Sequence, residues 1–285
     1  MERQKRVAAI HDISCFGKCS LTVALPMLSA AGIETCCIPT AVLSTHTGGF
    51  SGYTYRDLTE DILPVASHWK SLSLQFDAVY TGFLGSEEQA DIIDRVINEI
   101  ADKDTLIMVD PVMGDDGKLY PVFSDTFPTA MKKLCTRADV IVPNMTEAFL
   151  LLHEPYRQGP YTEKEISRIV DGLATICPGQ IVLTGVHFDE KTLGAATFDP
   201  KTGVKEFVLR DRVNGFYHGT GDVYAASLLS ALMCGFSLHD AAAIAADYTV
   251  LSIVTTKKMD KDLRYGVNFE QNLPTLMRML GRNEG

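Results

Sequence analysis

The sequence has little positive charge. Its 26 Lys and Arg residues are outnumbered by 36 Asp and Glu residues, which gives a formal net charge of −10. A chain this acidic is a poor match for nucleic acid or for an anionic membrane surface, so both are excluded as partners. An anionic substrate such as a nucleotide would need local positive groups. These could be backbone amides, a metal ion, or a few Lys and Arg side chains.

The sequence also lacks a cysteine framework and long hydrophobic runs. The seven cysteines are odd in number and scattered, which indicates reduced thiols in a cytoplasmic protein. A zinc site from Cys15, Cys19, Cys36 and Cys37 is disfavoured by the adjacent pair and by the missing Cys-x-x-Cys spacing. The first apolar run, residues 7–10, is too short for a signal peptide or a membrane span, and neither is predicted.

There is no internal repeat, low-complexity tract or linker, so the 285 residues are expected to form one domain over 1–285. Short apolar segments alternate with helical segments through most of the chain. This alternation predicts an α/β fold with a mostly parallel central sheet and helices on both faces. The expected strands are 6–10, 34–38, 78–81, 105–109, 140–142 and 180–183, with a hairpin from 195–198 and 205–209. The expected helices are 21–31, 86–100, 126–134, a segment after Glu147, 162–176, 223–233, 238–252 and 270–280.

Polar residues follow or end several of the expected strands. They are Asp12, Asp110, Asn144, Thr184 and, after the last strands, Asp222. A single polar residue at a strand end is usually a turn former. Ligands of parallel sheets, however, bind beyond the carboxyl ends of the strands. Five polar residues at one edge therefore favour a functional site there.

The sequence lacks a P-loop. Gly17-Lys18-Cys19-Ser20 superficially resembles the end of a Walker A motif. Asp12 stands where that motif needs its first Gly, and Cys19 follows the Lys, so this interpretation is rejected.

The tetrapeptide Gly219-Thr220-Gly221-Asp222 opens an Ala- and Leu-rich segment that should be helical. Glycines before a helix allow a sharp turn and leave backbone amides uncovered at the positive end of the helix dipole. These amides can bind phosphate oxygens. Asp222 would then act as a base that accepts a proton from an attacking hydroxyl. The alternative is that Asp222 is only a helix cap. At a helix start it should be ionised, with its pKa lowered by less than about one unit.

Asn144 and Glu147 lie three residues apart at the start of a helix, so their side chains share one side of its first turn. Carboxylate and amide oxygens suit Mg²⁺, directly or through water, and Asp110 and Asp115 add two further oxygen ligands. Considered alone, Asn144 and Glu147 are better explained by helix capping.

Residues 45–53 combine glycines with polar and aromatic side chains, which is typical of a surface turn or of a mobile flap over a small aromatic ligand. We expect a substrate-covering flap near 41–55. Arg212 can contact phosphate oxygens or be a solvated loop charge. Tyr120 fits either the core or the flank of a ligand.

Together these residues resemble the ribokinase-like superfamily, and within it the pyridoxal (pyridoxamine) kinases, which phosphorylate vitamin B6. The resemblance covers nearly the whole chain, from the Ile10-His11-Asp12 strand end to the helix after Asp222. The motifs that carry it, in family order, are Thr45-His46-Thr47-Gly48, Asp110-Pro111-Val112-Met113-Gly114-Asp115, Pro143-Asn144-Met145-Thr146-Glu147 and Gly219-Thr220-Gly221-Asp222.

The resemblance implies a single ribokinase-like kinase domain that uses ATP and Mg²⁺, with a monovalent cation such as K⁺ as an open question, and that forms a homodimer. Asp222 would activate the 5′-hydroxyl of the vitamer. Gly219, Thr220 and Gly221 would form the anion hole. The other implied roles are ATP contacts for Thr184, Arg212, Val213 and Tyr120, metal contacts for Asp110, Asp115, Asn144 and Glu147, and vitamer contacts for Asp12, His46, Thr47 and Phe83.

Three residues depart from the family pattern. Asp12 stands where many relatives have Ser, Phe83 where many have Tyr, and Val142 where some have Thr. These departures leave open which vitamer is preferred and how its ring is held, and Asp12 could favour a cationic amine or a protonated ring nitrogen. Two alternatives remain. One is a hydroxymethylpyrimidine kinase, which shares the fold, and the other is a non-catalytic protein that binds B6 or nucleotide.

Overall fold

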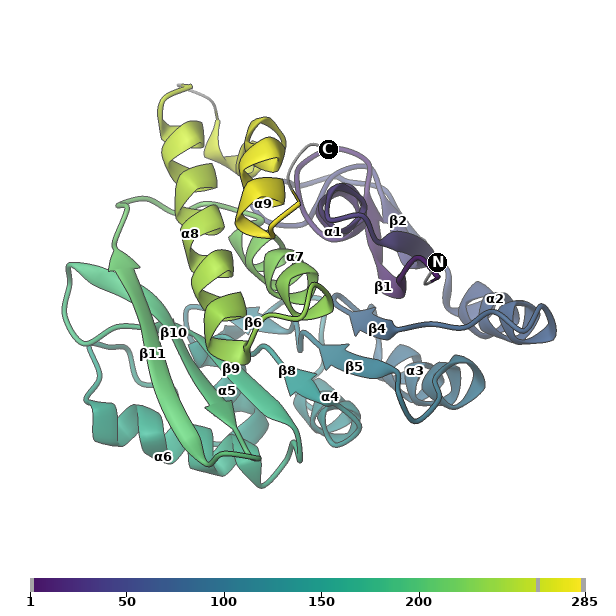
Figure 1. The fold of residues 1–285 in the computed structure, drawn as a ribbon, viewed down its shortest axis with the longest axis horizontal. Helices are drawn as coiled ribbons and strands as arrows, with labels where there is room; N and C mark the ends of the chain where they lie inside the picture. Colours follow the sequence, from purple (N-terminus) through teal and green to yellow (C-terminus); the bar gives the residue numbers. More distant parts are fainter. Residues whose placement is uncertain (1–2, 260–261, 283–285) are drawn as a thin grey trace.

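The computed structural model describes residues 3–259 and 262–282, and a nine-stranded sheet forms its centre (Figure 1). The strands are β1 (Arg6–Ser14), β2 (Glu34–Leu43), β3 (Tyr55–Asp57), β4 (Ala78–Thr81), β5 (Leu106–Val109), β8 (Val140–Ile141), β9 (Gln180–Val186), β10 (Thr192–Asp199) and β11 (Val204–Asp211). A separate small hairpin pairs β6 (Gly114–Asp115) with β7 (Lys118–Leu119).

The sheet order is β11-β10-β9-β8-β5-β4-β1-β2-β3. All neighbours from β9 to β2 pair in parallel, whereas β10, β11 and β3 are antiparallel additions at the two edges. Val7, Ala8, Ala9 and Ile10 of β1 are fully buried, as expected for a central parallel strand that is covered on both faces. The predicted α/β class with a mostly parallel sheet is confirmed.

Helices cover both faces of the sheet, and each face has its own apolar core (Figure 1). One face is covered by α2 (Thr59–Ser71), α3 (Glu87–Ile100), α4 (Phe127–Cys135), α5 (Met145–Leu152) and α6 (Glu163–Ala174). The other is covered by α1 (Leu21–Ala30), α7 (Thr220–Met233), α8 (Leu238–Lys257) and α9 (Leu273–Met279). Two short 3₁₀ turns, η1 (Leu263–Tyr265) and η2 (Glu270–Asn272), precede α9. Within the described residues, no helix is long and apolar enough to cross a membrane.

Local sequence explains several helix starts. At α6, Thr162 accepts a hydrogen bond from the Glu165 amide and Glu165 accepts one from the Thr162 amide, which is a complete capping box. At α3, Ser86 accepts from the Gln89 amide, but the Gln89 side chain accepts from the Gly85 amide instead of the Ser86 amide. The capping box at residues 86–89 is therefore only half formed.

Several boundaries differ from those expected from the sequence. β1 continues to Ser14, so Asp12 lies inside an extended strand and not after its end. A register irregularity occurs at this point, where His11 pairs with Pro39 but Ile13 pairs with Val42. β2 likewise continues to Leu43 and pairs with β3, which the sequence did not predict. The predicted flap is the loop of this β2–β3 hairpin, residues 44–54.

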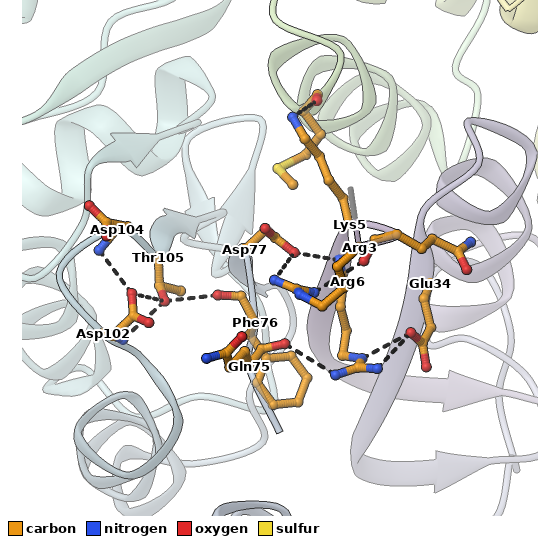
Figure 2. A network of polar contacts seen from close by, with 12 residues as sticks. Arg3, Lys5, Arg6, Glu34, Gln75, Phe76, Asp77, Asp102, Asp104 and Thr105 are labelled. Carbon is orange, nitrogen blue, oxygen red and sulfur yellow. Dashed lines mark hydrogen bonds and ion pairs between the residues drawn. The ribbon is translucent and has the colours of Figure 1, made fainter. Parts of the chain in front are cut away.

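Polar contacts close the edge of the sheet where β1, β4 and β5 begin (Figure 2). Asp77 Oδ2 accepts a hydrogen bond from the Arg6 amide at 2.7 Å and pairs with Arg3 Nη2 at 2.9 Å. Thr105 Oγ1 donates to the Phe76 carbonyl at 2.9 Å. This network fixes the strand starts at the amino-terminal edge and leaves the opposite edge free for a ligand site.

Candidate active site

A cavity of about 830 Å³ lies at the carboxyl ends of the parallel strands. Its volume is near the upper end for small-molecule sites. Every site residue predicted from the sequence lines it: Asp12, His46, Thr47, Phe83, Asp110, Asp115, Tyr120, Asn144, Glu147, Thr184, Arg212, Val213, Gly219, Thr220, Gly221 and Asp222. The fold thus brings together residues that are more than 200 positions apart in the chain.

The amino terminus of α7 opens onto the cavity. Gly219 caps the helix in the left-handed region, with φ +76° and ψ 3°, and a Cβ atom there would collide with the Lys18 carbonyl oxygen. A side chain is therefore excluded at Gly219 both by backbone conformation and by space. A Cβ atom on Gly221 would meet nothing within 4 Å. The first-turn amides, which have no intrahelical acceptor, are accessible from this open side.

Asp222 is half-buried in the cavity wall. Burial raises the pKa of its carboxyl group to about 7, the nearby Ser20 amide lowers that pKa, and the charge of Asp12 raises it. The sequence-based expectation of a slightly lowered pKa was wrong. The helix dipole contributes only ~0.3–1 kcal/mol, and the loss of solvent around the carboxylate outweighs it. A carboxylate that titrates near neutrality is a stronger base than an ordinary Asp.

Asp12 lies on the same side of the cavity and is only 4% exposed. Ser14 Oγ donates a hydrogen bond to Asp12 Oδ2 at 3.0 Å. Burial raises the pKa of the Asp12 carboxyl group, while Ser20 and Ser14 lower it by hydrogen bonding. A cationic ligand group at this point would favour the ionised carboxylate.

β1 and β4 each contribute one buried ring that carries polar atoms. His11 and Tyr80 pack edge to face, with ring centroids 4.3 Å apart. Among the residues that the structure describes, neither the two ring nitrogens of His11 nor the Tyr80 hydroxyl has a hydrogen-bond partner. Burial lowers the pKa of His11 to about 3, so its ring is neutral.

The predicted metal ligands lie around one part of the cavity, but two of them are also engaged in capping α5. Asn144 Oδ1 accepts from the Glu147 amide at 2.9 Å. The two carboxylate oxygens of Glu147 accept from the amides of Asn144 and Met113, at 2.8 and 3.1 Å. Within residues 3–259 and 262–282, no group of three or more His, Cys, Asp or Glu side chains is arranged as a metal site. The capping interpretation of Asn144 and Glu147 is therefore what their contacts show.

The same region is nevertheless rich in buried carboxyl groups. Burial raises the pKa values of Asp110 and Glu147, and repulsion from Glu147 and then Asp222 raises that of Asp110 further. A positive charge between the cavity and these carboxyl groups would relieve their repulsion. Because the oxygens of Glu147 already accept backbone hydrogen bonds, this residue suits an ion held through water better than one held directly.

On one side, the cavity is lined by Leu43 at the end of β2 and by His46, Thr47, Phe50 and Tyr53 of the flap. His46 is only 7% exposed, and both its ring nitrogens are within hydrogen-bonding distance of backbone groups. The resemblance implies a vitamer contact for His46, yet these bonds leave only ring carbon atoms free for a ligand.

Facing the flap, Phe83 packs against Phe123 with ring centroids 5.5 Å apart. Phe83 therefore presents an apolar ring to the cavity, without the hydroxyl group that a Tyr would bring.

The other end of the cavity lies between β9–β11 and α8. Thr184 lies in β9 and forms an isolated parallel bridge with Asn144. Arg212 Nη1 lies 3.3 Å from Glu190 Oε2 at the exposed rim.

Burial raises the pKa of Tyr120, so its hydroxyl group stays protonated and can donate a hydrogen bond.

Sequence reasoning missed most of the walls at this end. The missed residues include Leu193, Gly194, Arg210, Ala246, Thr249, Val250 and Ile253. Small and β-branched residues of α8 look like ordinary core in a sequence. Arg210, which forms an ion pair with Asp247 at 2.5 Å, is the basic residue among them that could have signalled this wall.

Comparison with known proteins agrees with this geometry. The sequence matches the family described as phosphomethylpyrimidine kinase over residues 25–266. A solved structure of pyridoxal kinase from Lactobacillus plantarum is 30% identical, covers 99% of this chain and 100% of its own, and has a TM-score of 0.90. A Bacteroides thetaiotaomicron protein, provisionally named as a phosphomethylpyrimidine kinase and crystallised with pyridoxal, is 37% identical over 96% of both chains, with a TM-score of 0.92.

Among the curated proteins, the pyridoxine/pyridoxal/pyridoxamine kinase of Bordetella avium is 26% identical over 270 residues, covering 89% of this chain and 86% of its own. The family match spans far more than half of the sequence, and the cavity holds the residues that the family motifs predict. The chain therefore belongs to the phosphomethylpyrimidine kinase family, within the ribokinase-like superfamily.

Proposed function

We propose that this protein transfers the γ-phosphoryl group of ATP to the 5′-hydroxyl group of a B6 vitamer: pyridoxal, pyridoxine or pyridoxamine. The observation that carries the proposal is the position of Asp222 beside the open amino terminus of α7, within one cavity that is large enough for two ligands. The names of the Lactobacillus and Bordetella relatives, and the pyridoxal in the Bacteroides structure, support a B6 vitamer as the phosphoryl acceptor.

In the proposed reaction the amides at residues 219–222 hold the phosphate oxygens and orient the γ-phosphorus toward the vitamer. The 5′-oxygen forms a bond to the γ-phosphorus, and the bond from that phosphorus to the β–γ bridging oxygen breaks, which releases ADP. The hydroxyl proton passes to the Asp222 carboxylate. Because the transition state is loose, the base accepts this proton late and mainly orients the hydroxyl group.

Mg²⁺ would be held near Asp110, Asp115, Asn144 and Glu147, where it would neutralise charge on the phosphates. This proposal is supported by the raised pKa values of the buried Asp110 and Glu147 carboxyl groups, which a cation would bring back toward their usual range. A monovalent cation such as K⁺ beside Asp110 would act in the same sense. Thr184, Arg212, Val213 and Tyr120 are proposed to contact ATP, and Thr47, Phe83 and Asp12 to contact the vitamer.

The test is a coupled ADP-release assay with pyridoxal, pyridoxine, pyridoxamine and hydroxymethylpyrimidine as parallel acceptors. We expect at least one vitamer to give the highest kcat/KM, with activity lost in EDTA and restored by Mg²⁺. Exchange of K⁺ for tetramethylammonium tests the monovalent ion. Preference for the pyrimidine would contradict the choice of substrate. Tight vitamer binding by calorimetry without any ADP release would identify a non-catalytic binding protein.

The pH dependence of the reaction should reflect Asp222. Because the base must be ionised and its pKa is about 7, kcat is expected to rise with pH through 7. Below that value it should fall about tenfold per pH unit. The measurement is kcat at saturating substrates between pH 5.5 and 8.5. A profile that stays flat down to pH 5.5 would contradict the role of Asp222 as the base.

Asp12 is proposed to favour a cationic vitamer group, because it is a buried carboxylate that faces the cavity. Replacement Asp12→Ser is expected to lower the pyridoxamine-to-pyridoxal ratio of kcat/KM about ten- to a hundredfold, the effect of losing a hydrogen bond to a charged group. Pyridoxine, whose substituent is uncharged, serves as the internal control. An unchanged ratio would remove Asp12 from vitamer selection.

We also propose that the protein is a cytoplasmic homodimer, as the family resemblance implies. Light scattering on the purified chain tests the dimer, and a monomer mass at micromolar concentration would contradict it. Cell fractionation tests the location.

A further inference from the structure

One short segment contacts three of the loops that line the cavity. Residues 262–267, which we call the strap, run between α8 and η2. The Arg264 carbonyl oxygen lies 2.6 Å from His46 Nε2 in the flap. The Tyr265 carbonyl accepts from the Lys18 amide at 3.2 Å, in the loop before α1. The Val267 amide donates to the His218 carbonyl at 3.2 Å, in the loop that ends at Gly219.

The hydrogen bonds of His46 define its protonation state. The Gly48 amide donates to His46 Nδ1 at 3.1 Å, so Nδ1 carries no proton. The proton is therefore on Nε2, which donates to the Arg264 carbonyl. Burial lowers the pKa of this imidazole, in agreement with the neutral form. The ring thus joins the turn of the flap to the strap, and both its nitrogens are used in doing so.

The side chain of Arg264 holds the flap from the outside. Its guanidinium group lies 5.5 Å from the centroid of the Phe50 ring, a distance typical of a cation–π contact. A Cβ atom on Gly49 would lie 3.1 Å from Arg264 Cγ and Cδ, so the flap backbone passes close over the arginine stem. Asp262 orients the guanidinium group, with Arg264 Nε 3.0 Å from Asp262 Oδ1.

Aromatic rings extend this contact on both sides. Phe50 and Tyr265 are parallel to within 6°, with centroids 6.4 Å apart. His46 lies 5.0 Å from Phe50 and 5.1 Å from His218, measured between ring centroids. A Cβ atom on Gly48 would lie 2.6 Å from the His218 ring, so the flap also packs directly on the residue before Gly219. The flap and the loop that ends at Gly219 are therefore held by the same few side chains.

We propose that the strap fixes the flap over the vitamer and that His46 and Arg264 are positioning residues for vitamer binding. This inference rests on the proposed kinase function for its kinetic part. His46 acts through the strap and does not bind the vitamer through its nitrogens. The strap also holds the His218 carbonyl, but through the Val267 amide, a backbone contact that the side chains of His46 and Arg264 do not make.

The kinetic test compares Arg264→Ala with Arg264→Lys and with Arg278→Ala, an exposed arginine of α9 far along the chain from the flap. Arg264→Ala is expected to raise KM for pyridoxal about fivefold, the size of an exposed cation–π contact. KM for ATP and the thermal midpoint should stay unchanged. Arg264→Lys, which retains a cation over Phe50, should restore most of the loss, and Arg278→Ala should behave as wild type.

A second pair of variants tests whether His46 acts through its hydrogen bond to the Arg264 carbonyl. Gln can still donate to the Arg264 carbonyl from its amide nitrogen, whereas Ala cannot. His46→Gln is therefore expected to retain a lower pyridoxal KM than His46→Ala. Equal KM values for the two variants would contradict the hydrogen bond to the strap. If neither folds, the Arg264 variants still decide the proposal.

Hydrogen exchange provides a measurement that needs no substrate. In Arg264→Ala, the amides of residues 44–54 should exchange about fivefold faster than in wild type, and those of α3 should not change. Unaltered exchange in the flap would overturn the strap proposal. Faster flap exchange in a protein without kinase activity would support the strap while contradicting the proposed function.

Discussion

Replacing Asp222 with Asn is expected to lower kcat by about two to four orders of magnitude, the usual contribution of a general base. Asn has nearly the same shape as Asp, but it cannot accept the proton of the vitamer hydroxyl group. KM for ATP should change little, because the amides at the start of α7 remain in place. Steady-state kinetics by ADP release gives both constants.

The control for this variant is its stability. The folded protein raises the pKa of Asp222 to about 7, well above that of an unfolded Asp, so the folded state binds more protons than the unfolded state between these two values. The free energy of unfolding therefore falls as pH rises from about 4 to about 7, and above pH 7 this loss is complete because Asp222 is ionised in both states. At pH 8 the Asp222→Asn variant should unfold at the same temperature as wild type or higher. A loss of kcat smaller than tenfold would argue against Asp222 as the base.

Gly219→Ala is expected to have the second-largest effect. Its left-handed φ costs about 1–2 kcal/mol for any L-residue with a side chain. The collision of the new methyl group with the Lys18 carbonyl adds about 1–3 kcal/mol. The free energy of unfolding should fall by about 2–5 kcal/mol, and displacement of the first α7 amides should raise KM for ATP. Urea denaturation and steady-state kinetics measure the two effects.

Gly221→Ala is the matched control, because the same methyl group would enter open space there. It lies in the first turn of α7, so its stability should remain within about 1 kcal/mol of wild type. If both variants lost the same stability, the close approach of Lys18 to Gly219 would not explain the requirement for glycine.

The parallel strands could be predicted from the sequence because each is a short apolar run followed by a turn signal. Ala78–Thr81 was predicted with the bounds that β4 has in the structure. The polar residues predicted at the strand ends line one cavity, because parallel strands end at the same edge of the sheet. By contrast, α2 was not predicted. Pro64 lies within it and removes one helical hydrogen bond, so only packing of residues such as Ile62 and Ala66 makes the segment helical.

The pKa values and contacts of the site residues were harder to predict than which residues form the site. The pKa of Asp222 depends on how much solvent the surrounding loops remove, and no local pattern encodes that quantity. The environment of His46 depends on Arg264, 218 residues further along the chain. Asn144 and Glu147 show the opposite case. Their capping contacts are local and were predicted as one of two alternatives.

A carboxylate that changes charge near neutrality makes the proposed reaction sensitive to the acidity of its surroundings. If Asp222 titrates at about 7, the ionised share of molecules falls about threefold between pH 7.5 and 6.5. An ordinary Asp would show no such change over this interval. Mild acidification would then slow formation of the phosphorylated vitamer without any dedicated inhibitor, simply because half-buried oxygens hold their proton more tightly.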